Sequence, residues 1–306
     1  MPKLRFQYVS GSQGAETLVQ FLTRRFPYHN EPEWTDLVLA GNVTVNNSPV
    51  SPRLQLRTGH RIAYERPATA EPPVDDRFHI LHEDEHLLVV DKPANLPTSP
   101  SGKYWDHCLV HIAAKRLGYR QLYAVHRLDR ETSGANVLAK TSEAASILGK
   151  AFAAGQVQKE YTAILRGDFP CRDAFVSVPL MNDPEGEIRI RQVPSTAGRK
   201  AETRFTLLAR LPGASLVRAL PLTGRTHQIR AHAWYLGHPV LGDKLYGSAD
   251  AVFLNFTRSE VRILERRQLL HSSRIRFPHP VTSDLVDVRS SPQSLLEIFS
   301  MAPRSP

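Results

Sequence analysis

The chain has 306 residues, of which 41% are hydrophobic and 23% are charged. This length and apolar content allow a sizeable buried core and more than one domain, and they exclude wholesale disorder. Lysines and arginines number 39 against 30 acidic residues, a formal net charge of +9 that favours a polyanionic partner such as nucleic acid. No stretch approaches the roughly 18 uninterrupted apolar residues of a membrane span, and the first residues lack the apolar core of a signal peptide. We expect a cytoplasmic protein with no membrane association.

Residues 1–66 are predicted to form a small N-terminal domain. Leu18 to Phe26 and Trp34 to Ala40 have the pattern of short helices, and Asn42 to Val50 predicts two short strands around an Asn-Asn turn. Arg61 to Tyr64 would add a closing strand. Residues 1–75 contain eight lysines and arginines against seven acidic residues, so nearly all of the net charge of +9 lies in the rest of the chain.

Residues 67–77 are rich in proline and poor in core-forming residues, which predicts a linker. Residues 78–300 then form the larger domain. Its predicted strands alternate with few helices, which favours an α+β fold with a mixed, largely antiparallel sheet. The predicted elements, in chain order, are strands at 79–82, 87–90 and 137–139, a helix at 141–154, strands at 161–165, 204–209 and 215–220, a helix ending near Gly237, and a strand at 273–277.

The run His126-Arg127-Leu128-Asp129-Arg130-Glu131-Thr132-Ser133-Gly134 places one carboxylate between two arginines and follows it with turn residues. Neighbouring cations favour the ionised carboxylate, so Asp129 is suited to act as a nucleophile, a general base or an electrostatic stabiliser. Asp129 is therefore the first candidate for a catalytic residue. The alternative is an ordinary surface turn, for which these residue types are also typical.

Two further runs carry residues suited to RNA. In Leu222 to His232, the side chains of Arg225, His227 and Arg230 surround a predicted helix start and are available for phosphate or an acidic residue. The alternative is a capped surface helix with ordinary arginines.

The second of these runs is Lys159-Glu160-Tyr161, on a predicted strand where Lys159 and Tyr161 point to the same face. Tyr161 could stack on a splayed-out base. The alternative is a tyrosine of the hydrophobic core.

The two cysteines, Cys108 and Cys171, lack the paired spacing of a zinc site or a redox motif and are expected to be free thiols. His227, His232 and His238 do not form a recognised metal-binding spacing. We therefore expect no bound metal.

Together, these runs resemble the motifs of RluA-type pseudouridine synthases, in order and in spacing. The matching segments are HRLDRETSG from His126, KEYTAILRG from Lys159 and LTGRTHQIRAHAWYLGHPVLGDKLYG from Leu222. The resemblance extends to Val89-Val90-Asp91-Lys92-Pro93 and to Leu270-His271 through His279-Pro280, and it covers roughly residues 78–290. It implies a pseudouridine synthase domain that isomerises specific uridines in ribosomal or transfer RNA without metal or cofactor.

The resemblance also assigns roles. Asp129 is implied to be the catalytic aspartate, Arg225 its ion-pair partner and Tyr161 the residue that stacks on the target base. Leu270 is implied to pack against that base. The RNA-binding residues expected beside them are Arg127, Arg130, Lys159, His227 and Arg230. Whether Asp129 attacks the sugar or abstracts a sugar proton stays open.

The N-terminal domain resembles, more weakly, a small RNA-binding domain shared by many of these synthases and a ribosomal protein. The matching segments are Leu39 to Asn47 and Leu56 to Ile62. Positions that are usually rich in arginine include Glu31, Glu33 and Asp36, and the near-neutral charge argues against strong phosphate binding.

Two alternatives to the enzyme are considered. One is an RNA-binding or ribosome-assembly protein without activity; the other is a glycosidic-bond hydrolase that uses the same aspartate. No obligate protein partner is expected, and the chain is expected to be a monomer.

Overall fold

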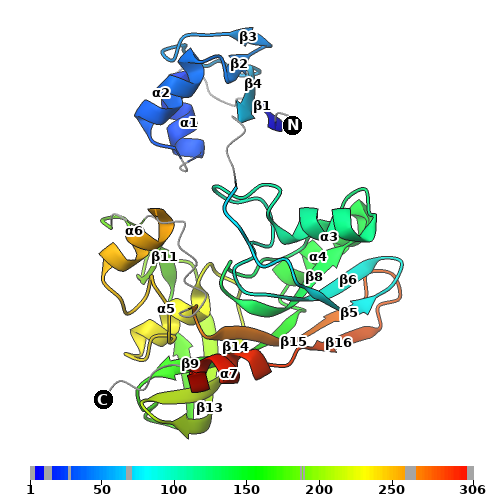
Figure 1. Ribbon diagram of the computed structural model, residues 1–306, viewed down its shortest axis with the longest axis vertical. Helices are drawn as coiled ribbons and strands as arrows, with labels where there is room; N and C mark the ends of the chain where they lie inside the picture. The colour runs from blue at the N-terminus through cyan, green and yellow to red at the C-terminus, as the bar shows by residue number, and fades with distance from the viewer. Residues whose placement is uncertain are drawn as a thin grey trace. The chain divides into compact units, whose positions relative to one another are not determined.

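The computed structural model describes residues 4–9, 16–26, 29–66, 71–186, 188, 190–258 and 267–301. The chain divides into two compact units, Met1–Glu71 and Pro72–Pro306, so the boundary lies within the predicted linker at 67–77 (Figure 1). Residues 67–70 of that linker lie outside the described part. Its last residues belong to the larger unit, because Val74 packs beside Phe78 and the carbonyl of Pro72 is 2.7 Å from Nδ1 of His107.

The smaller unit is a four-stranded antiparallel sheet with two helices. Its elements are β1 (Leu4–Val9), α1 (Leu18–Arg25), α2 (Glu31–Leu39), β2 (Val43–Val45), β3 (Ser48–Pro49) and β4 (Arg61–Arg66), in the sheet order β1-β4-β2-β3. Asn46 and Asn47 both have positive φ, which is the geometry of the expected Asn-Asn hairpin turn.

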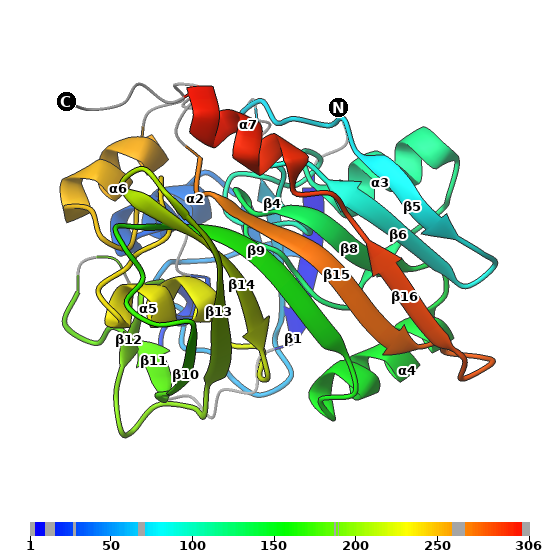
Figure 2. The same cartoon turned by 90° about the horizontal axis from the view of Figure 1, so that it is seen from below.

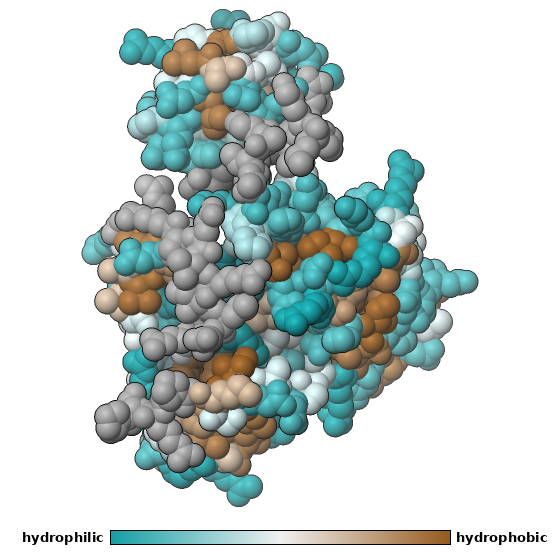
Figure 3. Space-filling view, viewed as in Figure 1, coloured by the Kyte–Doolittle hydropathy of each residue, from teal (hydrophilic) through white to brown (hydrophobic). Residues whose placement is uncertain are grey.

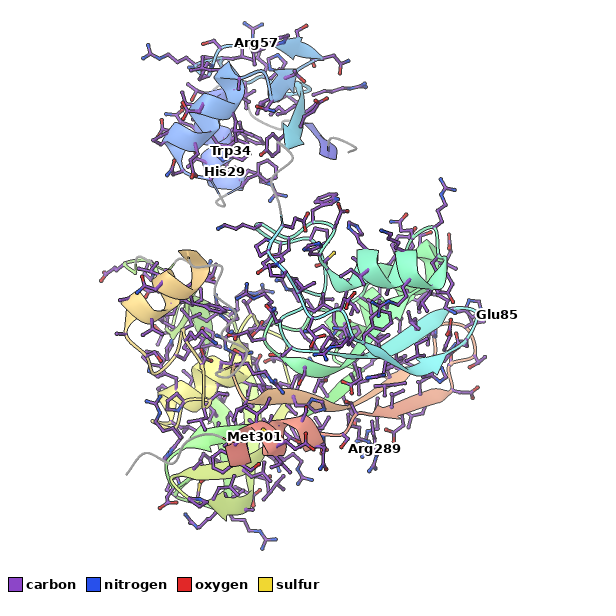
Figure 4. The ribbon with its side chains drawn as sticks, in the orientation of Figure 1. His29, Trp34, Arg57, Glu85, Arg289 and Met301 are labelled. Atoms are coloured by element: carbon purple, nitrogen blue, oxygen red, sulfur yellow. The ribbon has the colours of Figure 1, made fainter. Side chains whose placement is uncertain are left out.

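Strand β1 was not predicted, and helix α2 starts three residues before its predicted start. It does so because the side chain of Asn30 accepts a hydrogen bond from the backbone N–H of Glu33, and Glu33 bonds back to Asn30. The core of this unit is built on Trp34, which packs edge-on against His29 with ring centroids 4.9 Å apart (Figure 4).

The larger unit is built around one extended mixed sheet, and both faces of that sheet carry helices (Figure 2). Its elements are β5 (His79–Glu83), β6 (Leu87–Lys92), α3 (Leu109–Leu117), β7 (Tyr123–Ala124), β8 (Ser133–Ala139), α4 (Ser142–Ala153), β9 (Gln158–Arg166), β10 (Asp173–Ser177), β11 (Leu180–Asn182), β12 (Gln192–Pro194), β13 (Glu202–Leu211), β14 (Ala214–Pro221), α5 (Gln228–Tyr235), α6 (Asp250–Arg258), β15 (Leu270–Pro278), β16 (Leu285–Arg289) and α7 (Gln293–Met301).

The main path of the sheet runs β10-β13-β14-β9-β15-β8-β6-β5, with β16 beside β15 and β7 beside β8. Among the described strands only β8 and β15 pair in parallel; the others pair antiparallel. The predicted α+β fold with a mixed, largely antiparallel sheet is therefore confirmed. Several short elements were not predicted, including the three-residue strands β11 and β12, which are too short to show a two-residue periodicity.

Alternate residues of the central strands face opposite layers of the unit. Helix α4 packs on β6, β8 and β15 through one apolar cluster, and α5 packs on β9, β13 and β14 through a second. Helix α3 packs on β6 and β8 on the side opposite to α4. Helix α7 packs on β9 and β14 on the side opposite to α5, in front of the sheet in Figure 2. Tyr161 and Leu270, from the adjacent strands β9 and β15, belong to the cluster under α5. The sheet thereby brings β9 and β15, which are far apart in the sequence, next to the end of the His126–Gly134 run.

The parallel contact between β8 and β15 depends on Gly134, the last residue of the His126 run. Gly134 has φ +108°, and a Cβ there would lie 2.3 Å from the carbonyl oxygen of Ser272 on β15. Replacing Gly134 with Ala is expected to destabilise the fold by about 2–5 kcal/mol, from backbone strain and overpacking together. Gly149→Ala is the control, because a Cβ at this helical position of α4 meets nothing within 4 Å. Denaturant unfolding of both variants measures the difference, and equal midpoints would contradict it.

The face drawn in Figure 3 mixes hydrophilic and hydrophobic residues in both units. Within the described residues, no helix has the length and apolar character needed to cross a membrane.

Candidate active site

Asp129 lies on the loop between β7 and β8, and hydrogen bonds on both sides hold the backbone of this loop. The hydroxyl of Thr98 accepts from the N–H of Leu128 at 3.1 Å and lies 3.2 Å from its carbonyl. The N–H of Leu96 donates to the carbonyl of Arg130 at 3.1 Å. The loop that presents the carboxylate is therefore fixed before any ligand binds.

Lys92 adds a buried cation beneath the same loop. Its ammonium is fully buried and donates to the carbonyls of Pro93 and Leu96, both at 2.8 Å, and to that of Arg130 at 3.4 Å. Burial and the charge of Arg267 lower the pKa of Lys92 to about 7. Lys92 lies in a segment, Val89 to Pro93, that matches the family motifs, but no role was predicted for it.

The carboxylate of Asp129 is ion-paired with Arg230 of helix α5. Nη1 of Arg230 donates to Oδ2 of Asp129 at 2.7 Å. Burial raises the pKa of Asp129, but the charges of His227 and Arg230, the hydrogen bond from Arg230 and the charge of Arg127 outweigh it and lower the pKa to about 2. Asp129 is thus ionised at neutral pH, and of the two flanking arginines only Arg127 is among the causes, after His227 and Arg230.

A second carboxylate holds the other edge of the same guanidinium. Nε and Nη2 of Arg230 donate to Asp243 at 2.6 and 2.9 Å, and Oδ1 of Asp243 also accepts from the N–H groups of Leu245 and Tyr246. The ring of Tyr246 lies 5.1 Å from the guanidinium. A bidentate pair of this kind fixes the direction of Arg230 as well as its charge. Neither Asp243 nor Tyr246 was singled out from the sequence.

The predicted ion pair between Asp129 and Arg225 is wrong. Arg225 precedes helix α5, in a turn where its N–H donates to the side chain of Gln228, and its Nε donates to the carbonyl of Lys200 at 2.9 Å. Arg230, five residues later and inside the helix, forms the ion pair with Asp129 instead. Arg230 was expected to contact phosphate, which is also wrong, because it is buried and carboxylates occupy both edges of its guanidinium.

His227 also lies at the carboxylate. Its Nε2 is 3.9 Å from Oδ1 of Asp129, and its Nδ1 is 3.3 Å from the hydroxyl of Tyr246. Burial and the charge of Arg230 lower the pKa of His227 to about 4, so the imidazole is uncharged at neutral pH. A neutral, largely enclosed imidazole is not suited to the phosphate contact that the sequence analysis expected.

Tyr161 and Leu270 come from the adjacent strands β9 and β15. Both are buried and belong to one cluster with Leu128 and Ile229. Burial and the nearby charge of Asp129 raise the pKa of Tyr161, whose hydroxyl bonds to Ser272. Tyr161 is therefore a residue of the hydrophobic core, which was the alternative interpretation of the sequence. It also lies near the carboxylate of Asp129.

The other residues expected to contact RNA, Arg127, Arg130 and Lys159, differ in solvent exposure. Arg127 is exposed, and Lys159 is half-buried, with a pKa lowered by burial. Arg130 is half-buried; it donates to the hydroxyl of Tyr104, and its guanidinium lies 4.5 Å from the ring centroid of Phe256 on helix α6. Within the described residues, no three His, Cys, Asp or Glu side chains are placed to hold a metal ion.

Comparisons with known proteins show the family of the chain. A family model described as RNA pseudouridylate synthase matches residues 86–234. Ribosomal large subunit pseudouridine synthase D of Zymomonas mobilis is 35% identical over 249 residues, which cover 78% of this chain and 77% of that protein. Ribosomal large subunit pseudouridine synthase C of Haemophilus ducreyi is 32% identical over 296 residues, covering 92% of this chain and 90% of that protein.

A solved structure, human RNA Pseudouridylate Synthase Domain Containing 4, matches with a TM-score of 0.56 and 25% identity, covering 72% of this chain and 91% of that one. The mixed sheet, the loop aspartate and these similarities define the class: the chain belongs to the RNA pseudouridylate synthase family. It is an isomerase that converts uridine in RNA into pseudouridine.

Proposed function

We propose that this enzyme isomerises specific uridines of ribosomal RNA, with Asp129 as the catalytic residue. The observation that carries the proposal is the carboxylate of Asp129, whose Oδ2 is bound to Arg230 and whose neighbour Leu128 shares an apolar cluster with Tyr161 and Leu270. The names of the relatives in Zymomonas mobilis and Haemophilus ducreyi, which refer to the ribosomal large subunit, support ribosomal RNA over transfer RNA.

The reaction breaks the bond between N1 of uracil and C1′ of ribose and forms a bond between C5 and C1′. C5 loses a proton and N1 gains one, so no redox change occurs. A carboxylate with a pKa of about 2 is ionised and can act at the sugar, as a nucleophile or as a base. The target base must leave its stack, at a cost of a few kcal/mol. Tyr161 stacks on it, and Leu270 packs against it.

The remaining cations serve the RNA around the target. Arg127 fills the space that the base vacates or binds the neighbouring RNA backbone, and its exposure two residues before Asp129 supports this role. Arg130 and Lys159 are charged groups within the same region and provide phosphate contacts. The enzyme is proposed to act as a monomer in the cytoplasm.

The proposal is tested by site-resolved mapping of pseudouridine in total RNA from cells with and without this gene, complemented by wild type or by Asp129→Ala. One or more pseudouridines in large-subunit ribosomal RNA should disappear on deletion and return only with wild type. Loss of a site in transfer RNA instead would correct the substrate. Return of the site with Asp129→Ala would remove Asp129 from the mechanism.

The reaction product distinguishes the pseudouridine synthase from the alternative, a glycosidic-bond hydrolase. Isomerisation leaves the mass of the RNA unchanged, whereas hydrolysis of the glycosidic bond releases uracil and leaves an abasic site. Mass spectrometry of the modified fragment from the same cells distinguishes the two reactions.

The N-terminal unit is proposed to add little to RNA affinity. Residues 1–75 have eight basic and seven acidic residues, and the salt-dependent part of RNA affinity comes from cations that neutralise phosphates. Deleting residues 1–66 is expected to change the dissociation constant for ribosomal RNA by less than about threefold and the salt dependence by less than one phosphate contact. Filter binding across a salt series measures both. A tenfold loss of affinity would show that the unit binds RNA in spite of its charge.

A further inference from the structure

His227 has a backbone conformation that its residue type rarely adopts. It has φ +54° and ψ +16° at the N-cap of helix α5, the left-handed region that glycine or asparagine enters more readily. Its side chain forms no capping hydrogen bond to the helix. Backbone strain of about 1–3 kcal/mol at such a position persists where the surrounding structure enforces it, and it is concentrated at functional sites. The strained position therefore has a role other than capping the helix.

The hydrogen bonds around Tyr246 determine which nitrogen of His227 carries the proton. The Tyr246 oxygen accepts from the backbone N–H of Gln192 at 2.8 Å, so its own hydrogen is free to be donated to Nδ1 of His227, 3.3 Å away. The opposite arrangement would leave the buried hydroxyl hydrogen without this acceptor. It would also direct the Nε2 lone pair at the carboxylate of Asp129, which is electrostatically unfavourable.

Nε2 then carries the hydrogen on the side of Asp129. The distance of 3.9 Å between Nε2 and Oδ1 is too long for a hydrogen bond, so Oδ1 is not engaged by His227 in this state. Oδ2, in contrast, is occupied by Arg230 at 2.7 Å. The two oxygens are thus unequal: one is held by a cation, and the other faces a neutral N–H donor.

We infer that His227 is a positioning residue that makes the unbound Oδ1 of Asp129 the reacting oxygen, and that the Tyr246 hydroxyl fixes the imidazole in the Nε2–H form required for this. The inference rests on the proposed role of Asp129. The N–H dipole favours negative charge on Oδ1 without binding it, so the oxygen stays available to the sugar. The left-handed backbone conformation of His227 directs the imidazole to this position.

The test uses the full-length enzyme and single-turnover kinetics on an unmodified transcript of large-subunit ribosomal RNA. In His227→Gly the backbone strain is relieved, so the melting temperature should stay the same or rise, while kcat falls about 10–100-fold at a KM within about twofold of wild type. His227→Asn tolerates the same backbone and keeps an N–H donor, and it should recover part of the lost kcat.

Tyr246→Phe removes the hydroxyl that fixes the imidazole and should lower kcat in the same direction, without changing KM. Tyr119→Phe is its matched control, because that hydroxyl bonds to Glu83 at the surface, away from the site. Long-range proton–nitrogen NMR spectra of wild type should show Nε2 protonated and Nδ1 unprotonated for His227, and a mixture of both forms in Tyr246→Phe.

Two results would overturn the inference. A rise in KM with unchanged kcat in His227→Gly, together with a weaker salt dependence, would make His227 a phosphate contact instead. An Nδ1–H form of His227 in wild type would contradict the geometry even without kinetics. If wild type formed no pseudouridine, the proposed substrate would fail, while the NMR spectra would still decide the protonated nitrogen.

Discussion

Asp129→Asn should form no measurable pseudouridine, with kcat reduced by at least about 10³-fold, because the amide can neither attack the sugar nor accept its proton. The variant should still fold, because Arg230 keeps its bidentate partner Asp243 and no buried charge loses all its partners. Its affinity for the RNA should stay within about threefold of wild type, since Asp129 is not a phosphate contact. Single-turnover assays and filter binding on the same preparation measure both quantities.

The ionised state of Asp129 can be tested independently through its dependence on pH. The pKa of Asp129 is lowered to about 2, so the carboxylate stays ionised as pH falls through the weakly acidic range. Its contribution to stability is present above the unfolded pKa of about 4 and is lost as pH falls through the folded pKa of about 2. Titration of Asp129 should therefore cause no change in the reaction rate at weakly acidic pH. NMR titration of the side-chain carboxyl carbon of Asp129 measures its pKa, and a midpoint at weakly acidic pH would contradict the lowered pKa.

Arg230→Met is expected to have the second largest effect. It leaves two carboxylates, Asp129 and Asp243, without their shared cation, and like charges at one site disfavour ionisation of both. Breaking a buried ion pair by removing one partner costs about 3–5 kcal/mol of stability, and loss of a fixed carboxylate should lower kcat about 10²–10³-fold. Denaturant unfolding and single-turnover rates measure the two effects separately.

Arg225→Met is the matched control, because it removes the same charge from the neighbouring turn, where the side chain of Arg225 donates to the backbone carbonyl of Lys200. It should change stability by less than about 0.5 kcal/mol and leave kcat unchanged. The double variant Arg230→Met with Asp243→Asn should regain stability, since the uncompensated buried charge is removed, but not activity. An Arg225→Met enzyme as impaired as Arg230→Met would contradict the pairing seen in the structure.

The sequence alone determined the class of fold and the catalytic candidate. Strand periodicity with few intervening helices predicted the mixed, largely antiparallel sheet, because alternate side chains of a half-buried strand must differ in polarity. The run from His126 to Gly134 identified Asp129, because its cationic neighbours are local and remain close in any fold. The Asn-Asn hairpin turn was found for the same reason, since its positive φ values depend on the residues themselves.

The partners of Asp129 were decided by the tertiary structure. Arg225 and Arg230 belong to one motif and have the same charge, and only the start of helix α5 at Gln228 and the position of that helix on the sheet determine which one reaches the carboxylate. Asp243 and Tyr246 come from a later loop, and Lys92 from the end of a distant strand. Such contacts depend on how separate elements pack, and spacing along the chain does not encode them. Local residue chemistry thus identified the candidate carboxylate, whereas long-range packing supplied His227 and Arg230, which lower its pKa most and hold it in place.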